Sequence, residues 1–251
     1  MPARLTNIAS NALRPGYLMT MLRKAVLRAE PDTRAAATAW ASERARRIDE
    51  WCRGVDETLW ELVLDHAETM EADARRRIAE TGEPFGGGGA HTLLAFLVRL
   101  RRPAVVVETG VAAGWSSRAI LESLRANGGG ALHSSDFPYF RLREPERFIG
   151  VVVPEDLRAD WHLDVRGDRR ALPSIVATVE HIDLFHYDSD KSVSGRRFAM
   201  GVVEPRLAPG AVVIMDDIQD NTFFADWVTE RGIPHLVFEF EGKYLGAVGL
   251  E

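Results

Sequence analysis

The sequence has almost no cysteine and no long apolar run, and each shortage excludes a class of protein. Cys52 is the only cysteine among the 251 residues, which excludes an intramolecular disulfide and a metal site built from several cysteines. No stretch approaches the roughly 20 consecutive apolar residues that a membrane span needs, and the N-terminus lacks the apolar run of a signal peptide. We therefore expect a soluble, cytoplasmic protein with no membrane partner.

An excess of positive charge is also missing. The formal net charge is -6, with 27% charged and 46% hydrophobic residues. Proteins that bind nucleic acid usually present a basic face, so this balance does not favour nucleic acid as a partner. A chain of this length is explained by one α/β domain with an appended helical segment, without a second independent core.

The most informative stretch is VVVETGVAAGWSS at residues 105–117. Its β-branched run predicts a strand buried on both faces. Gly110 and Gly114 then predict a tight turn whose backbone a ligand can approach, and a helical pattern begins at Ser116. A strand, a glycine turn and a helix in this order are typical of nucleotide-binding α/β folds, where the ligand lies beside the helix N-terminus.

Two details distinguish this stretch from a dinucleotide site. The glycine spacing is G-x-x-x-G instead of G-x-G-x-x-G, and Glu108 stands just before the first glycine. A carboxylate there would repel a pyrophosphate and suit an ammonium group. A glycine turn after a strand also occurs in α/β proteins that bind no nucleoside, so that alternative stays open.

The E-T-G-x-x-x-G-x-S run resembles motif I of the class I S-adenosylmethionine-dependent methyltransferases. The resemblance implies a Rossmann-like, seven-stranded sheet, mostly parallel with one antiparallel strand, and helices on both faces. It also implies that Glu108, Gly110, Gly114 and Ser116 contribute to binding S-adenosylmethionine. A closing hairpin of two predicted strands, near residues 235–240 and 244–250, agrees with the antiparallel strand of that sheet.

Further cofactor residues are expected after the next two strands. Asp136 ends a short predicted strand, at about the distance from the glycine turn where such folds place the acid that binds the ribose hydroxyls. A carboxylate in this position also serves to cap a turn. By resemblance to methyltransferases, Asp168 and Arg169 would border the adenine. The long segment 137–160 follows Asp136, and insertions of this kind are where α/β enzymes build substrate specificity.

Acidic residues end two further predicted strands. The strand at 182–187 runs into D-x-D-K at residues 188–191, and the strand at 211–215 runs into Asp216 and Asp217. Neighbouring parallel strands would bring these carboxylates to one crevice, where they need a cation because unpaired buried charges are costly. A cysteine-free set of oxygen ligands suits magnesium, manganese or calcium.

The D-x-D-K run, an L-x-P-G turn and a strand ending in Asp-Asp resemble the cation-dependent O-methyltransferases of the catechol and macrolide-sugar types. The resemblance implies that Asp188, Asp216 and Asp217 bind a divalent cation, with magnesium expected. It places a catalytic base at Lys191 or Asp188. The catechol type has asparagine where this chain has Asp217, so the assignment of the base stays open.

Together these patterns predict a methyltransferase that uses S-adenosylmethionine and a divalent cation to methylate a hydroxyl of a small molecule, a sugar or a polyphenol-like natural product. One alternative is a metal-independent methyltransferase, in which the acids only form hydrogen bonds. Another is a non-catalytic binding protein of the same fold. A nicotinamide-dependent oxidoreductase is disfavoured by Glu108 and by the glycine spacing.

The domain prediction divides the chain at residue 82. Residues 1–82 are expected to form a helical extension, with helices from Tyr17 to about 27, from about 33 to 52 and from about 56 to 80. This extension would act as a lid, as a contact in a homodimer or as a structural brace. Residues 83–251 would form the cofactor-binding domain, which begins with a glycine loop at 86–89 that is either a gate or a plain linker.

Overall fold

The structure is a computed structural model that describes residues 7–8, 10–11, 13, 17, 32–139 and 141–250. The first predicted helix, from Tyr17 to about residue 27, lies outside the described residues apart from Tyr17 itself. Within the described part of the chain, no helix combines the length and the apolar character needed to span a membrane.

One eight-stranded sheet forms the centre of the fold, with strand order β1-β7-β8-β6-β5-β2-β3-β4. All pairs are parallel except those of β8, which is antiparallel to both of its neighbours. The strands are β1 Ala45–Arg47, β2 Val105–Thr109, β3 Ala131–Ser135, β4 Trp161–Asp164, β5 Ile182–Tyr187, β6 Leu207–Met215, β7 Leu236–Phe240 and β8 Lys243–Val248. The predicted mostly parallel sheet is confirmed, with β1 as an additional edge strand.

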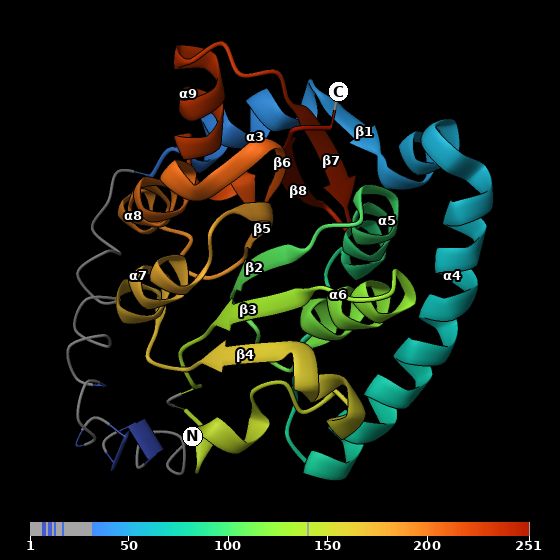
Figure 1. The fold of residues 1–251 in the computed structure, drawn as a ribbon. Helices are drawn as coiled ribbons and strands as arrows, with labels where there is room; N and C mark the ends of the chain where they lie inside the picture. Colours follow the sequence, from blue (N-terminus) through green and yellow to red (C-terminus); the bar gives the residue numbers. More distant parts are fainter. Residues whose placement is uncertain are drawn as a thin grey trace.

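Helices cover both faces of this sheet (Figure 1). The helices α4, α5 and α6 lie on one face, and α7, α8 and α9 lie on the other. Their bounds are α3 Arg34–Ser42, α4 Ile48–Thr81, α5 His91–Arg101, α6 Trp115–Ala126, α7 Asp168–Thr178, α8 Val193–Val203 and α9 Phe223–Glu230.

The alternation of side chains along the strands builds a separate core on each face. Val106 and Leu184 point into the core beneath α4, α5 and α6. The next residue of each strand, Val107 and Phe185, points into the core beneath α7, α8 and α9. Because successive side chains of a strand face opposite ways, strands covered on both faces need an unbroken apolar run. This requirement explains the run of valines that precedes the glycine turn.

The described part of the N-terminal extension differs from the prediction of two separate helices at 33–52 and 56–80. Helix α3 ends at Ser42, and residues 45–47 instead pair in parallel with β7 as strand β1. Helix α4 then begins at Ile48 and continues to Thr81, with non-helical backbone angles at Asp56, where the second helix was expected to begin. The arginine-rich pattern favoured a helix, but the open edge of β7 provides hydrogen bonds that override it.

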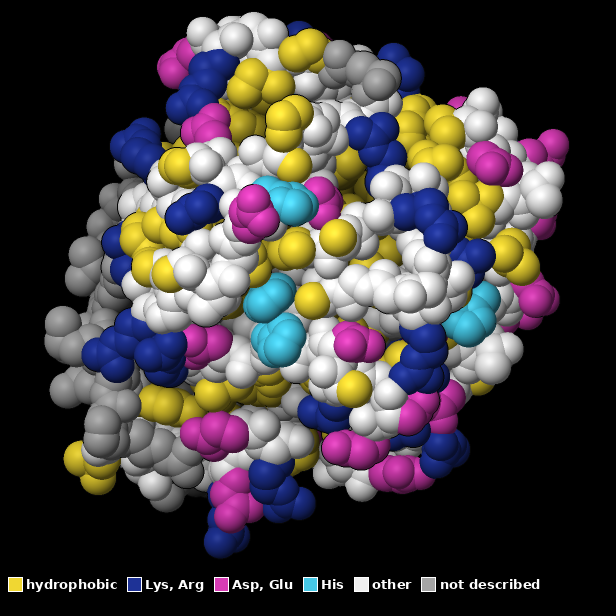
Figure 2. All heavy atoms as spheres, in the orientation of Figure 1, with side chains coloured by type: hydrophobic (Ala, Val, Ile, Leu, Met, Phe, Trp, Pro, Cys, Tyr) yellow, Lys and Arg dark blue, Asp and Glu magenta, His cyan; other side chains and the backbone are white. Residues whose placement is uncertain are grey.

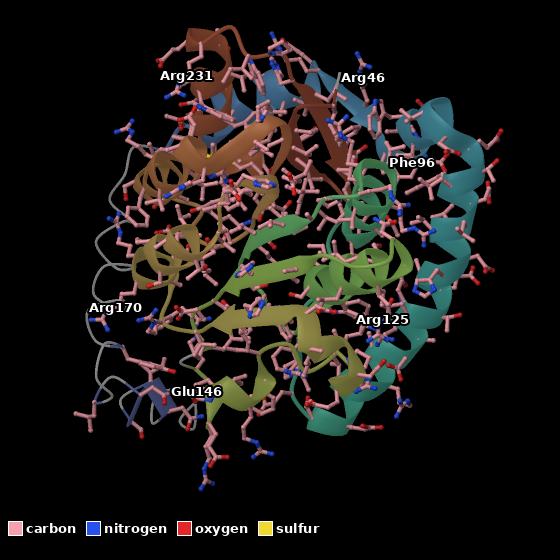
Figure 3. The ribbon with its side chains drawn as sticks, viewed as in Figure 1. Arg46, Phe96, Arg125, Glu146, Arg170 and Arg231 are labelled. Atoms are coloured by element: carbon pink, nitrogen blue, oxygen red, sulfur yellow. The ribbon has the colours of Figure 1, made fainter. Side chains whose placement is uncertain are left out.

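Helix α4 is fastened to the sheet through aromatic contacts with α5. Trp51 and Trp60 both meet the ring of Phe96 edge to face, with ring centroids 6.0 and 5.7 Å apart. Figure 3 labels Phe96 on α5, on the side of that helix where α4 lies. The outer surface of α4 carries ion pairs between residues one turn apart, such as Arg76 with Glu80. On the face shown in Figure 2, basic and acidic side chains are likewise interspersed.

Cys52 belongs to α4, and its side chain is fully buried in the core between α4, α5 and the sheet. Burial raises the pKa of its thiol to about 12. Because the thiolate is the reactive form, we expect Cys52 of the native protein to resist a disulfide reagent at mildly alkaline pH and to react once the chain is unfolded in guanidinium. Labelling of the native protein at the rate of free cysteine would contradict this placement.

Candidate active site

The site lies where the carboxyl ends of β2, β5 and β6 meet at one edge of the sheet. The backbone N–H of Asp188 donates to Thr109 O at 3.0 Å, and that of Asp216 donates to Tyr187 O at 2.9 Å. Strands β2 and β5 are neighbours in the sheet. The chain continues from β2 to β3 on one side of this pair and from β5 to β6 on the other side, so the strand order reverses between β2 and β5. Ligands of open α/β sheets bind at such a reversal of strand order.

The two glycines of the turn are required by the packing of the protein itself. Gly110 has φ +83°, and a Cβ atom there would lie 2.2 Å from the carbonyl oxygen of Asp188. Gly114 has φ +96°, and a Cβ atom there would lie 2.8 Å from Cα of Gly150. The turn is therefore pressed against the loop that carries the predicted metal ligand. A close approach of the cofactor to these glycines stays a prediction.

Glu108 is fully buried, with no exposed side-chain surface. Its carboxylate accepts hydrogen bonds from Ser116 Oγ at 2.5 Å, Ser117 Oγ at 2.6 Å and Ser134 Oγ at 2.9 Å. Burial alone would raise the pKa of Glu108, but the charge and hydrogen bonding of His186, together with the serine hydroxyls, lower it. With its side chain enclosed by these serines and His186, Glu108 contacts only protein groups here, and its contact with the ammonium of the cofactor stays a prediction. Glu108 fixes Ser116 and Ser117 at the start of α6.

Asp136 lies beside the glycine turn, as a ribose-binding acid must. Its Oδ2 accepts the backbone N–H of Ala112 at 2.9 Å, and its Oδ1 accepts that of Phe137 at 2.7 Å. These two bonds hold the carboxylate against the backbone of the glycine turn. The ribose role of Asp136 stays a prediction.

The residues predicted to border the adenine have side chains that contact other parts of the protein. Asp168 accepts from Ser135 Oγ and from Ser189 Oγ, both at 2.5 Å, and so bridges the ends of β3 and β5. The guanidinium of Arg169 lies 4.4 Å from the ring centroid of Phe198 on α8. Their predicted place at the adenine therefore depends on the backbone at the start of α7 and stays a prediction.

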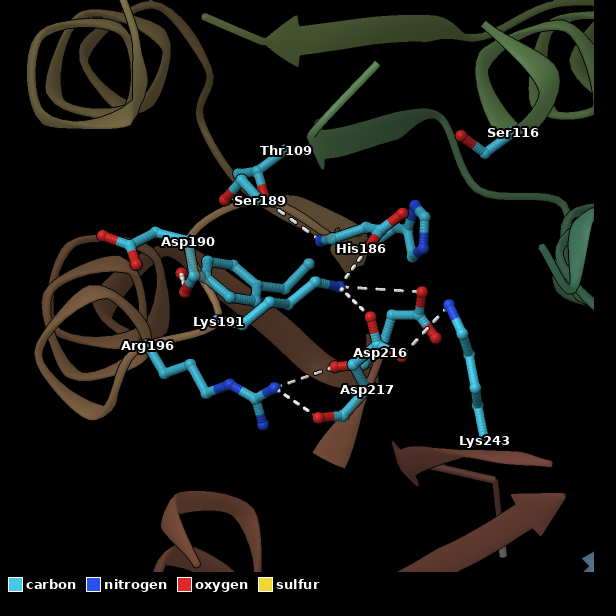
Figure 4. Close-up of polar contacts among 12 residues, drawn as sticks. Thr109, Ser116, His186, Ser189, Asp190, Lys191, Arg196, Asp216, Asp217 and Lys243 are labelled. Atoms are coloured by element: carbon cyan, nitrogen blue, oxygen red, sulfur yellow. Dashed lines mark hydrogen bonds and ion pairs between the residues drawn. The ribbon is translucent and has the colours of Figure 1, made fainter. Parts of the chain in front are cut away.

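The three acids predicted to bind a metal converge. One carboxylate oxygen each from Asp188, Asp216 and Asp217 lies within 4.8 Å of the others, the single such group of three found among the described residues. Lys191 reaches into the same cluster, as Figure 4 shows. Its Nζ pairs with Asp188 Oδ1 and lies 3.1 Å from Asp217 Oδ2 and 3.7 Å from Asp216 Oδ2.

The charges in this acidic cluster perturb one another. Burial, together with the negative charges of Asp188 and Asp217, raises the pKa of Asp216 to about 6. Burial alone would lower the pKa of Lys191, but the three carboxylates raise it. Burial alone would raise the pKa of Asp217, but Lys191 and Lys243 lower it. The lysine is therefore held as an ammonium, while the acids still carry more negative charge than it can neutralise.

Two basic residues of the site have no signal in the sequence. Lys243 at the start of β8 lies 3.4 Å from Asp217 Oδ1. Arg196 on α8 is fully buried and donates from Nη2 to the carbonyl oxygens of Asp216 at 3.0 Å and Asp217 at 2.7 Å. An arginine in a helix is usually solvated, so only the packing of α8 against the β6 loop reveals this contact.

The glycine loop lies over a cavity next to the start of α6. The cavity has a volume of about 380 Å³, and its lining includes Phe85, the loop glycines, His91 and Trp115. His91 is 93% buried, with Nδ1 3.2 Å from Gly89 O and Nε2 3.1 Å from Glu71 Oε1. The loop thus packs against the first residue after the glycine turn, as a gate would. Its movement stays a prediction.

Comparisons with known proteins agree with this architecture. Residues 107–218 match a family model described as a methyltransferase domain. An O-methyltransferase from Bacillus cereus, solved in complex with SAH, is 16% identical, with a TM-score of 0.54 over 80% of this chain and 96% of that one. A methyltransferase from Geobacter sulfurreducens is 17% identical, with a TM-score of 0.53 over 72% of this chain and 89% of that one. No curated protein matches the sequence.

The sheet order, the glycine turn and the structural likeness define a Rossmann-like methyltransferase fold. The matched domain extends from within β2 to just past Asp217, so it contains the whole glycine turn and all three acids. The prediction of a class I methyltransferase fold is thereby confirmed.

Proposed function

We propose that the protein is an O-methyltransferase that transfers the methyl group of S-adenosylmethionine to a hydroxyl of a small molecule, with the help of a divalent cation. The observation that carries the proposal is the convergence of Asp188, Asp216 and Asp217 directly beside the glycine turn of a methyltransferase fold. The Bacillus cereus neighbour was solved with SAH, which supports the same cofactor here.

The acidic cluster fits a hard divalent cation. Its donors are carboxylate oxygens only, the ligands that magnesium and manganese prefer. Burial and the neighbouring carboxylates of Asp188 and Asp217 raise the pKa of Asp216 and so disfavour its charged form, a cost that a bound cation would relieve. When bound, such a cation lowers the pKa of a coordinated hydroxyl and makes it nucleophilic at neutral pH.

Lys191 and Asp188 then have different tasks. An ammonium has three donors and no acceptor, so Lys191 orients the acceptor oxygen by donating a hydrogen bond. It cannot take a proton while the three carboxylates keep it charged. This arrangement favours Asp188 over Lys191 as the base, and it leaves the turn around Gly110 to place the sulfonium against the acceptor oxygen.

An aromatic wall beside the site supports a ring-containing acceptor. The ring of Phe85, which precedes the loop glycines, lies 6.1 Å from that of Tyr139 and 5.7 Å from that of Phe148, centroid to centroid. Burial, together with the charges of Asp136 and Asp188, raises the pKa of Tyr139. The Tyr139 hydroxyl is therefore within electrostatic reach of both the ribose acid and the acidic cluster. A planar phenol or a sugar ring fits such a wall.

A metal-independent methyltransferase is the second candidate, and the position of Lys191 favours it. The ammonium is paired with all three acids at once. In this case Lys191 itself is the cation that the acids share. The acids would then hydrogen-bond the acceptor directly.

Calorimetry separates the two candidates. We expect SAH to bind with and without EDTA, and one Mn²⁺ to bind the metal-free protein. We expect Asp188→Asn to weaken Mn²⁺ by at least about tenfold, because a removed ligand costs more than the 10-fold lower limit seen for outer-shell changes. Methyl transfer from labelled S-adenosylmethionine to a panel of phenols and sugars reports activity.

Turnover that EDTA leaves unchanged selects the metal-independent candidate. A protein that binds neither SAH nor S-adenosylmethionine contradicts both.

A further inference from the structure

Arg196 is the largest side chain that is buried completely in the described part of the chain. It lies on α8, whose first turn follows directly after Lys191 and its cap residue Ser192. Removing a guanidinium from water is expensive unless its hydrogen bonds compensate. Its contacts should therefore show what its burial achieves.

The guanidinium contacts the backbone of the acidic cluster and no carboxylate within hydrogen-bond distance. Nη2 donates to the carbonyl oxygens of Asp216 and Asp217 (Figure 4), while Nε and Nη1 have no hydrogen-bond partner among the described residues. Arg118, the other buried arginine of the described chain, behaves differently. It pairs with the carboxylates of Asp73 and Glu122 and fastens α6 to α4.

Asp217, one of the two residues whose carbonyl oxygen accepts from Arg196, has an unfavourable backbone conformation. Asp217 has φ +50°, in the left-handed region, which costs a residue other than glycine of order 1–3 kcal/mol unless its surroundings enforce it. Two hydrogen bonds from one nitrogen orient the peptide groups of both acids. With these groups fixed, the side chains of Asp216 and Asp217 both turn toward Asp188.

A second hydrogen bond joins the same two loops, with its donor on the loop after β6 and its acceptor on the loop after β5. Asn221, which follows β6, donates from Nδ2 to the carbonyl oxygen of Lys191 at 2.6 Å and is 94% buried. Arg196 thus reaches from the β5–α8 segment to the loop after β6, and Asn221 reaches back. The two loops that carry all three acids and the lysine are fastened to each other by these two side chains.

We propose that Arg196 and Asn221 are positioning residues, a cross-brace that sets the spacing of the carboxylates for a divalent cation. The inference rests on the proposed function for its cation. The cross-brace contacts backbone groups and none of the three carboxylates, so it acts on the geometry of the ligands and leaves their chemistry unchanged.

The test compares Arg196→Met with Arg101→Met. Arg101 is an exposed arginine whose Nη2 donates to Gly210 O at 2.9 Å, within β6 but away from the acids. We expect Arg196→Met to weaken Mn²⁺ by about 10- to 100-fold, the range for groups that orient metal ligands, with SAH affinity changed by less than about threefold. Backbone amides of residues 216–221 should exchange hydrogen faster. Arg101→Met should change none of these, and Arg196→Lys should restore part of the Mn²⁺ affinity.

The readouts keep this inference separate from the proposed function. If the wild-type protein binds no Mn²⁺, the cation proposal fails, and faster exchange at residues 216–221 in Arg196→Met still identifies the brace. If Arg196→Met does not fold, Asn221→Ala tests the brace from the other loop and should show the same faster exchange and weaker Mn²⁺ binding. Wild-type exchange and Mn²⁺ affinity in the folded variants would overturn the cross-brace.

Discussion

Gly110→Ala is expected to lower the free energy of unfolding by about 2–5 kcal/mol, through two costs that add. A left-handed backbone costs an alanine about 1–2 kcal/mol, and Gly110 has φ +83°. The new Cβ would also lie 2.2 Å from the carbonyl oxygen of Asp188, and relieving an overlap of this kind typically costs a further 1–3 kcal/mol, roughly. Denaturation in urea measures the sum.

The overlap also predicts a loss of function in the molecules that remain folded. Relief of the clash requires the backbone of Asp188 to move, and this movement carries its carboxylate away from Asp216 and Asp217. Mn²⁺ and SAH should therefore both bind more weakly to Gly110→Ala than to the wild-type protein.

Gly128→Ala is the matched control. Gly128 has φ +95°, but no atom lies within 4 Å of a Cβ built there. We expect it to lose only about 1–2 kcal/mol, the cost of the left-handed backbone, and to bind SAH normally. If both variants lost the same free energy of unfolding, the close contact between the glycine turn and Asp188 would not contribute to stability.

The sequence sufficed to predict the features that follow from strand geometry. The unbroken run Val105 to Val107 required a strand covered on both faces, and the structure places it at the centre of a parallel sheet. The convergence of Asp188 with Asp216 and Asp217 could also be expected, because parallel neighbours present their carboxyl ends at one edge. Both inferences need only the order and the direction of the strands.

The orientation of Glu108 was predictable from the same alternation, although the charge argument pointed elsewhere. Val106 and Glu108 share one face of β2, and that face is covered by α5 and α6. A residue at this position is buried whatever its charge, so three serine hydroxyls compensate it. The charge argument and the motif resemblance both directed the carboxylate toward the cofactor.

Strand β1 and Arg196 could not be found from local patterns. The three residues Ala45–Arg47 become a strand only because β7 offers an open edge. Arg196 is buried only because α8 packs against the loop after β6. The whole of strand β6 separates this loop from α8 in the sequence. Both depend on contacts between segments far apart in sequence, for which a single sequence carries no signal.

Asp216→Asn is expected to lower activity strongly and to stabilise the metal-free protein. The pKa of Asp216 lies at about 6, above its ordinary value of 3.8, so the fold disfavours its charged form. This cost is absent below about pH 4 and fully present above about pH 6. At about pH 8 in EDTA, the neutral asparagine should therefore raise the free energy of unfolding by about 1–3 kcal/mol, at about 1.4 kcal/mol per pKa unit. Near pH 4 the two proteins should have equal stability.

The same substitution should lower kcat/KM by about 10³-fold, since charge stabilisation by a metal ion supplies several kcal/mol. Magnesium should raise the thermal midpoint of the wild-type protein and leave that of Asp216→Asn unchanged, because only a bound ligand stabilises the folded state. Asp190→Asn is the matched control. Asp190 belongs to the same D-x-D-K run, but its carboxylate accepts the backbone N–H of Ser192, outside the acidic cluster.

The control should leave both stability and activity close to those of the wild-type protein. A loss of stability in Asp216→Asn at about pH 8 would show that Asp216 is held by attraction to Lys191 more than it is repelled by its acidic neighbours. The acids would then form a closed ion-pair network with their lysine, with no unmet charge for a divalent cation to neutralise.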